Sequence, residues 1–187
     1  MPSLPTGRQV RFLTVPSTDT RQRILGVALE LFGERGYAGS SIADITHRLG
    51  ISKAALYHHF AAKDDILQAL LTEPVARFRR LAGTAAGRPA GELLGAILDT
   101  TAELYAVSRL LGDDPSVRTT LVRAPIDDIN EALTAALGDG EPTPRARAAY
   151  AAVKNGTLAL MNATGAPPTP AARAELITAA RAALGDG

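Results

Sequence analysis

Small and polar side chains gather on one short segment, Ser52 to Phe60, around a pair of apolar residues. Leu56 and Phe60 are four residues apart and predict the buried side of a helix over Lys53 to Phe60. On its other sides, lysine can meet a guanine edge or a phosphate, alanine can lie against a thymine methyl group, and tyrosine and histidine can bond phosphate oxygens. This chemistry suits the major groove of DNA, although any amphipathic helix also has a solvated face. The positions that offer these groups are Lys53, Ala54, Ala55, Tyr57, His58 and His59.

A second short helix is predicted directly before that segment. The apolar residues of Ile42–Leu49 recur at helical spacing. Ser41 can cap the free amides at its start, and Asp44, three residues later, can complete a capping box. Gly50 can take the left-handed conformation that a tight turn between helices requires, and Ser52 can cap the next helix. Two short helices joined by such a turn indicate a helix-turn-helix, whose second helix enters the major groove.

The sequence around these helices resembles the TetR family of transcriptional regulators over roughly residues 18 to 70. The segment TRQRILGVALELFGERGY, Thr20 to Tyr37, is similar to the family's first helix. The segment LYHHFAAKDDIL, Leu56 to Leu67, is similar to the end of its recognition helix and the start of its fourth helix. The residues alone also predict the first helix, because one apolar stripe runs up to Gly36. The stripe consists of Ile24, Val27, Ala28, Leu31 and Phe32.

The resemblance assigns roles to individual residues. It implies that Ser41, Tyr57 and Lys63 contact phosphates, and that Ser52–Ala55 and His58 lie nearest the bases. The physics is compatible, because the Lys63 ammonium and the free amides at the start of the fourth helix would together form an anion site. Packing of Tyr57 against the first helix is the alternative at that position.

Length and charge indicate a small DNA-binding domain followed by a helical domain. The chain has 187 residues and a net charge of +1, with a surplus of basic residues up to Lys63 and of acidic residues after it. We expect an all-α fold of about nine helices, with an N-terminal three-helix helix-turn-helix domain and a C-terminal helical bundle. The expected divisions are a flexible tail at 1–17, a TetR-type DNA-binding domain at 18–78, and a helical ligand-binding and dimerisation domain at 79–187.

Several classes of protein are excluded by what the sequence lacks. There is no cysteine, so neither a disulfide framework nor a thiol redox sensor is expected. No apolar run reaches the length of a membrane span, and the first 17 residues lack the apolar core of a signal peptide, so a cytoplasmic location without membrane contact is expected. There is no P-loop, nucleophile elbow or zinc-protease motif, and no histidine after His59. We therefore expect no enzymatic activity, no catalytic residues, no metal site and no cofactor.

Glycine and proline divide the rest of the chain into further helices. Pro74 is predicted to kink or end the helix that begins at Lys63. The later helices are predicted at about 92–111, 115–122, 127–137, 144–163 and 171–184.

The resemblance implies that the last two helices pair with those of a second chain in a four-helix bundle. We expect a homodimer through residues of about 145–163 and 171–184, where small residues allow close helix contact. A single recognition helix gives little specificity, whereas a twofold dimer would read a palindrome. The alternative is that both segments only pack within their own chain.

The resemblance also implies a pocket for a small ligand between the later helices. We expect a small apolar or weakly polar organic effector, with Tyr105, Arg109 and Asn155 as its polar anchors. The apolar candidates can equally be plain core residues. The full set of candidate lining residues is Phe78, Leu94, Leu98, Tyr105, Arg109, Asn155 and Met161.

These features predict a sequence-specific DNA-binding transcriptional regulator. The favoured form is a homodimeric repressor that a small organic ligand releases from a palindromic operator. An activator or a ligand-independent regulator of the same family is one alternative, and a helical protein-interaction module is another.

Overall fold

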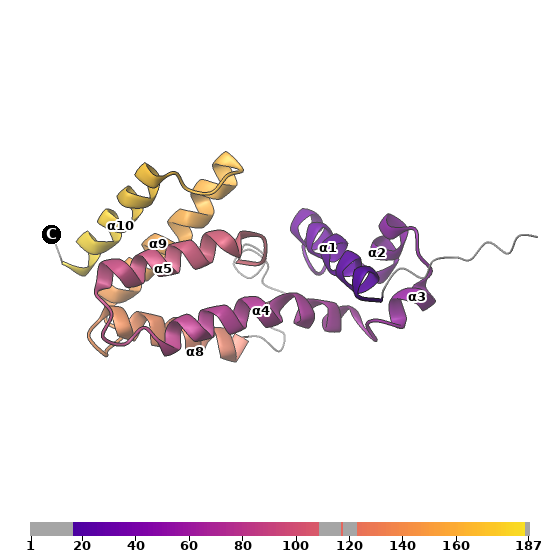
Figure 1. The fold of residues 1–187 in the computed structure, drawn as a ribbon, viewed down its shortest axis with the longest axis horizontal. Coiled ribbons are helices and arrows are strands. Elements are labelled where there is room, and N and C mark those ends of the chain that lie inside the picture. Colours follow the sequence, from indigo (N-terminus) through magenta and orange to yellow (C-terminus); the bar gives the residue numbers. More distant parts are fainter. Residues whose placement is uncertain (1–16, 109–116, 118–122, 186–187) are drawn as a thin grey trace, which may run out of the picture.

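The computed structural model describes residues 17–108, 117 and 123–185, and within these ranges the chain is helical and contains no strand. The expected all-α fold is confirmed. A long helix, α4, joins an N-terminal group of three helices to a C-terminal bundle (Figure 1). The helices are α1 (Ser17–Arg35), α2 (Ile42–Leu49), α3 (Lys53–Tyr57), α4 (Lys63–Gly83), α5 (Ala90–Glu103), α8 (Arg123–Leu137), α9 (Pro144–Thr164) and α10 (Pro170–Leu184).

The N-terminal helices share one hydrophobic core with the first half of α4. The apolar stripe predicted for α1 lies in this core, with Ile24 and Ala28 fully buried. Val107, which follows α5 in the sequence, packs into the same core and ties it to the C-terminal half. The main side chains that close it are Leu31, Phe32, Ile45, Leu56, Phe60, Ile66, Leu67 and Leu71.

A second core forms between α5, α8, α9, α10 and the second half of α4. Helix α9 packs against α5, α8 and α10, so it lies at the centre of the bundle. Alanines 146 and 149 on α9 are fully buried, which lets the neighbouring helices approach closely. The larger side chains of this core include Leu93, Leu94, Ile97, Leu98, Leu133, Tyr150 and Val153.

Helix α4 runs through Pro74 without ending and continues to Gly83. Proline lacks the N–H that would bond to the carbonyl four residues earlier, so the helix loses one backbone hydrogen bond there. Pro74 is buried, and the next residue, Val75, packs against both cores. The helix therefore crosses the division expected at residue 78, and the junction of the two cores lies a few residues before it.

One predicted helix in the C-terminal half is wrong. The segment 92–111 was expected to be a single helix, but α5 begins at Ala90 and ends at Glu103, and Leu104 forms a turn. A new helical stretch begins at Tyr105. Neither glycine nor proline marks this break, so nothing in the local sequence signals it. The helix predicted over 115–122 lies outside the described residues, apart from Val117.

The starts of the last two helices agree with the prediction. Thr143 and Thr169 each accept a hydrogen bond from the backbone N–H three residues later, and a proline occupies the first turn of each helix. Helix α8 begins at Arg123, earlier than the predicted residue 127. None of the helices in the described ranges combines the length and apolar character needed to cross a bilayer.

Candidate nucleic-acid interface

The start of α2 is fixed by a capping box, as predicted. The Asp44 N–H donates to the Ser41 hydroxyl at 3.2 Å, and the Ser41 N–H donates to the Asp44 carboxylate at 2.9 Å. The Ser41 hydroxyl also donates to that carboxylate. These bonds from Ser41, with a smaller contribution from Arg35, lower the pKa of Asp44. Ser41 remains exposed at the helix start, where a phosphate contact is expected.

The turn between α2 and α3 has the conformation that the sequence predicts. Gly50 has a φ of 66°, in the left-handed region. Its N–H donates to the His47 carbonyl at 3.2 Å, and the Ile51 N–H donates to the Thr46 carbonyl at 3.1 Å. Ser52 then caps α3 by accepting a hydrogen bond from the Ala55 N–H at 3.1 Å. The orientation of α3 relative to α2 is therefore set by local bonds.

Helix α3 is shorter than predicted. It ends at Tyr57, with His58 as its cap residue, and not at Phe60. The N–H groups of His59 and Phe60 both donate to the Leu56 carbonyl, at 2.9 and 3.0 Å, which tightens the chain into a turn. This turn still buries Leu56 and Phe60, at 0 % and 4 % exposure. The anchoring pair is thus the predicted one, although only the first of its members is on the helix.

The residues predicted to face DNA lie together on the outside of this segment. Ser52, Lys53, Ala54, Ala55 and His58 are exposed, and His59 is half-buried with its ring 5.4 Å from that of His58. The Tyr57 side chain is 51 % exposed, so it is not packed away against α1. The exposed face therefore presents hydrogen-bond donors, the Lys53 ammonium and small side chains, and the buried Leu56 and Phe60 hold it in place. Contact with a DNA groove requires such a face.

Lys63 makes structural contacts within the domain that the sequence does not predict. Its ammonium donates to the backbone carbonyls of Tyr37 at 2.8 Å and Ser40 at 3.0 Å, and lies 4.1 Å from the centre of the Tyr37 ring. An ammonium has three N–H groups, so one is left for a phosphate. The predicted phosphate contact stays a prediction.

The anion site expected at the start of α4 already contains two carboxylates. Asp64 and Asp65 lie in the first turn, and Asp65 accepts a hydrogen bond from the Ala62 N–H at 2.9 Å. Asp64 accepts a hydrogen bond from the Tyr37 hydroxyl. Burial, followed by this bond, raises the pKa of Tyr37. Tyr37 and Asp64 thus form a second link between the end of α1 and the start of α4.

Ion pairs join α1 to α2 on the outer side of this domain. Arg48 forms a two-pronged pair with Glu34, with both N–O distances at 3.0 Å, and Arg35 lies 3.4 Å from Asp44. The hydrogen bond from Arg48 is the main cause that lowers the pKa of Glu34. A surface depression of about 460 Å³ lies between the same helices, with His47 among its lining residues.

The residues predicted to line a ligand pocket have varied surroundings. Leu94 and Leu98 are buried in the second core at 0 % and 2 % exposure, and Phe78 packs against that core. Met161 is buried at 6 % exposure, whereas Asn155 is exposed. The Tyr105 hydroxyl donates to the Asn162 side chain at the end of α9. Arg109 lies outside the described residues. Their role in ligand binding stays a prediction.

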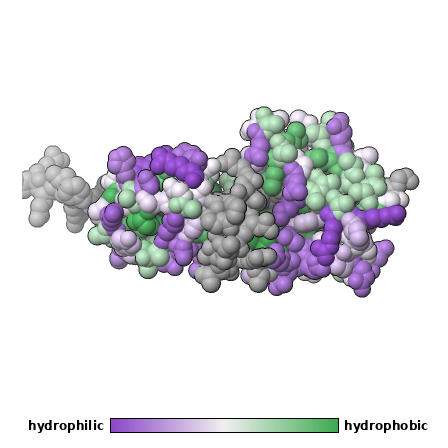
Figure 2. All heavy atoms as spheres, turned by 180° about the vertical axis from the view of Figure 1, so that it is seen from behind, coloured by the Kyte–Doolittle hydropathy of each residue, from purple (hydrophilic) through white to green (hydrophobic). Residues whose placement is uncertain are grey.

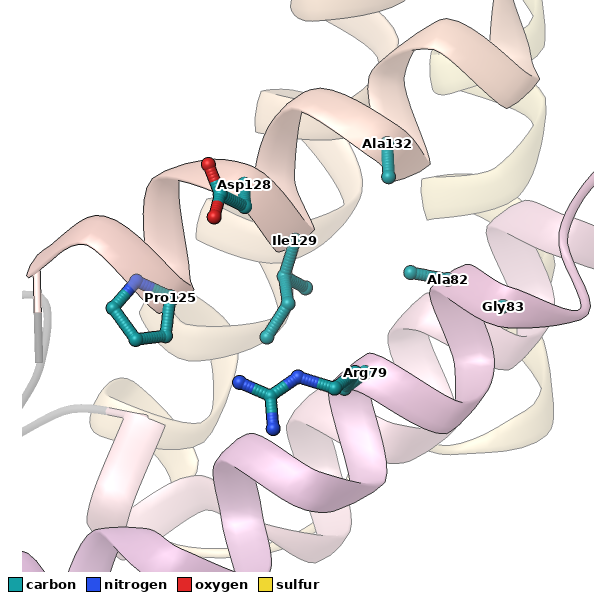
Figure 3. Close-up of a pocket in the computed structure, with 7 residues that line it drawn as sticks. All are labelled: Arg79, Ala82, Gly83, Pro125, Asp128, Ile129 and Ala132. Carbon is teal, nitrogen blue, oxygen red and sulfur yellow. The ribbon is translucent and has the colours of Figure 1, made fainter.

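A pocket of about 270 Å³ lies elsewhere, between α4 and α8 (Figure 3). None of the six predicted residues that the structure describes lines it. The described part of the chain contains no group of three or more His, Cys, Asp or Glu side chains that could hold a metal ion. The pocket is lined by Arg79, Ala82, Gly83, Pro125, Asp128, Ile129 and Ala132.

Comparison with known proteins gives the same family that the sequence resembles. Residues 24–70, which include most of α1, all of α2 and α3, and the start of α4, match the model of the bacterial regulatory proteins of the tetR family. The transcriptional regulator CymR of Pseudomonas putida is 33% identical over 57% of this chain and 51% of its own length. The transcriptional repressor AcnR of Corynebacterium diphtheriae is 32% identical over 52% of this chain and 53% of its own length. The chain thus spans about half the length of these curated relatives.

The structural comparison extends over nearly the whole chain. The crystal structure of AmtR from Mycobacterium smegmatis superposes with a TM-score of 0.69 and 27% sequence identity, over 95% of this chain and 90% of that one. The two curated relatives are named as transcriptional regulators and not as enzymes. The local geometry and the family model agree that residues 24–70 carry the domain of the tetR family of bacterial regulatory proteins, and the fold of the whole chain is similar to that of AmtR.

Proposed function

We propose that this chain is a sequence-specific transcriptional repressor that binds a palindromic operator as a homodimer and is released by a small organic ligand. The observation that carries the proposal is the exposed face of α3. Lys53, Ala54 and Ala55 stand on a helix whose position is fixed by the Ser52 cap and the buried Leu56. Side chains held in this way can approach base edges without a large ordering cost.

Base contacts and phosphate contacts are expected to have different effects. Lys53 is exposed at the start of α3, where it can reach a guanine edge. Ser41 and Tyr57 lie on either side of that position in the sequence and are exposed, so they suit phosphate contacts that set the register of the helix. Loss of a base contact should change sequence preference, whereas loss of a phosphate contact should weaken binding to all sequences.

The outer surface of α9 and α10 supports the homodimer. Helix α10 packs one side against the second core and fully buries Ala180 there, so its opposite side is left exposed within its own chain. Figure 2 shows hydrophobic residues gathered over the part of the molecule that contains α9 and α10. The exposed positions there include the small residues Ala159, Ala163, Ala171 and Ala174. A self-complementary surface of this kind can pair about a twofold axis, which would place two α3 helices on one palindrome.

Helix α4 supplies a connection between a ligand and DNA. It is part of both cores, with Leu71 in the first core and Phe78 packed against the second. A ligand that favours one position of α4 would therefore change the separation of the two α3 helices in a dimer. The ligand must bind the DNA-incompetent arrangement more tightly, because only a difference in affinity shifts the equilibrium. The name of AcnR as a repressor supports the sign of regulation.

The proposal is tested by selecting bound fragments from random and genomic DNA with the purified chain. The expected result is an enriched palindrome for the wild type and a changed preference for Lys53→Ala. Arg88→Ala is a matched control, because Arg88 is exposed in the loop between α4 and α5, far from α3 in sequence. If Lys53→Ala and the wild type enrich the same sequence, Lys53 does not take part in base recognition. If the wild type enriches no sequence, the proposal is contradicted.

A further inference from the structure

The groove between α4 and α8 combines one guanidinium group with an apolar floor. Arg79 comes from α4, and Pro125, Ile129 and Ala132 come from α8. Figure 3 shows the Arg79 side chain reaching across the groove toward Ile129 and Pro125. Ile129 is buried at 6 % exposure, whereas Arg79 is exposed. A ligand in the groove would thus meet a cation on one wall and hydrocarbon on the other.

Arg79 differs from the neighbouring arginines of α4 in having no anionic partner among the described residues. Arg77 pairs with Glu103 on α5, and Arg80 pairs with Glu73 at 2.8 Å. No hydrogen bond or ion pair joins the Arg79 guanidinium to a side chain of the described ranges, unlike those of Arg77 and Arg80. The Arg79 guanidinium therefore has no direct ion-pair partner within these ranges, although Asp128 also lines the groove, and an anionic group is its complementary ligand.

Asp128 limits which anion fits. It is on the α8 side of the groove, and Figure 3 shows it on the far side of Ile129 from the Arg79 guanidinium. A ligand with negative charge at both ends would meet repulsion there, whereas a single carboxylate at the Arg79 end would not. Arginine also matches a carboxylate well, because its planar donors can form two parallel hydrogen bonds.

The size and the floor of the groove favour a small acid with an apolar body. The volume of about 270 Å³ is near the lower end of ligand pockets. We propose that this groove binds a small monocarboxylate, with the carboxylate on Arg79 and the hydrocarbon part against Ile129, Pro125 and Ala82. This class differs from the uncharged or weakly polar effector that the sequence predicts. The inference names the ligand class of the proposed repressor, and its regulatory meaning rests on that proposed function.

Such a ligand would contact α4 and α8 at the same time. Arg79 is five residues after Pro74, on the part of α4 that belongs to the second core. A ligand that ties this part of α4 to α8 favours one position of the helix, and the first half of α4 carries Ile66 and Leu67 into the DNA-binding core. Binding in the groove would thereby influence the placement of α3.

The test is isothermal titration calorimetry of the whole chain without DNA, using benzoate and hexanoate as probes. Benzyl alcohol serves as the neutral probe and inorganic phosphate as the anion without an apolar body. The carboxylates should bind the wild type. Benzyl alcohol and phosphate should bind with affinities at least about tenfold lower. Absence of carboxylate binding at millimolar concentration would overturn the inference, and so would equal binding of benzoate and benzyl alcohol.

Three variants locate the binding. Arg79→Gln should weaken benzoate binding about tenfold or more, since it removes the charge but keeps most of the side chain. Arg80→Gln is the matched control, because Arg80 is the adjacent exposed arginine and does not line the groove, and it should bind like the wild type. Asp128→Asn should bind benzoate about as the wild type does, because the single carboxylate lies at the Arg79 end of the groove and away from Asp128. An equal affinity of Arg79→Gln and the wild type would place the binding elsewhere and overturn the inference.

A separate titration with operator DNA distinguishes this inference from the proposed function. If benzoate binds through Arg79 and weakens DNA binding by the wild type but not by Arg79→Gln, both stand. If benzoate binds through Arg79 and DNA affinity is unchanged, the groove stands and release by this ligand class fails. If the chain binds no DNA, the proposed function fails while the calorimetric result still decides the groove.

Discussion

The ammonium of Lys63 lies 4.1 Å from the centre of the Tyr37 ring and donates to the Tyr37 carbonyl at 2.8 Å. The two residues are at the start of α4 and just after the end of α1, so this contact closes the N-terminal domain. Lys63 also donates to the Ser40 carbonyl at 3.0 Å. A residue expected only to contact phosphate therefore also stabilises the fold.

Replacing Lys63 by methionine should lower both stability and DNA affinity. The loss of two charge-assisted hydrogen bonds is expected to reduce the free energy of unfolding by about 1 to 3 kcal/mol, measured by urea denaturation. If the third N–H reaches a phosphate, the slope of log affinity against log salt should also fall by about one. Lys53→Met is the control, because Lys53 is exposed and should leave stability unchanged. Unchanged stability of Lys63→Met would contradict the structural role.

Alanine at Gly50 and at Gly26 should have opposite effects on stability. A Cβ at either position meets nothing within 4 Å, so only the backbone conformation distinguishes them. Gly50 has a φ of 66°, where alanine is strained by about 1 to 2 kcal/mol. Gly26 is inside α1, where alanine is favoured by about 0.5 to 1 kcal/mol. Thermal or urea unfolding of the two variants measures the difference, and a stabilised Gly50→Ala would contradict the described turn.

The capping box should make the stability of the N-terminal domain sensitive to acid. The folded state lowers the pKa of Asp44 below its ordinary value of 3.8, mainly through hydrogen bonds from Ser41. A carboxyl with a lowered pKa contributes stability above its unfolded pKa, and this contribution is lost as the pH falls through the folded pKa. Below about pH 4, Asp44→Asn and Ser41→Ala should therefore lose less stability than the wild type. Unfolding curves at pH 7 and pH 3 test this, and parallel losses in all three proteins would exclude the box as the cause.

Glutamate at position 174 should separate the proposed dimer. Ala174 is exposed on α10, and a carboxylate there would be buried without a partner in a helical interface. Ala86→Glu introduces the same charge at an exposed position of the loop after α4 and serves as the control. Sedimentation analysis should find a dimer for the wild type and Ala86→Glu and a monomer for Ala174→Glu at micromolar concentration. A monomeric wild type would exclude the dimer, and a dimeric Ala174→Glu would place the interface elsewhere.

The parts of the DNA-binding domain that were predictable from sequence depend on residues close together in the chain. The capping box joins Ser41 to Asp44, and the turn at Gly50 is set by a single residue with no Cβ. Both follow from local hydrogen bonding and backbone sterics, which do not require knowledge of the tertiary fold. The stripe on α1 was predictable for a similar reason, since its period specifies which side is buried.

The structural features that the sequence does not predict depend on contacts between residues far apart in the chain, or on helix ends that no glycine or proline marks. Lys63 and Tyr37 are 26 residues apart, and the carbonyls of a turn have no sequence signature. Arg79 and Ile129 meet only because α4 packs on α8, so the groove could not be read from either helix alone. The end of α5 at Glu103 and the end of α3 at Tyr57 lack a glycine or proline, so helical spacing overestimated both helices.

Recognition of a palindrome by a dimer is tested most directly by a fluorescence anisotropy titration of the wild type with the selected palindrome, a single half-site and a scrambled duplex, at two salt concentrations. We expect salt-dependent binding of two chains to the palindrome, with much weaker binding to the half-site and to the scrambled duplex. Equal affinity for all three duplexes, or binding of one chain to the palindrome, would contradict sequence-specific recognition by a dimer.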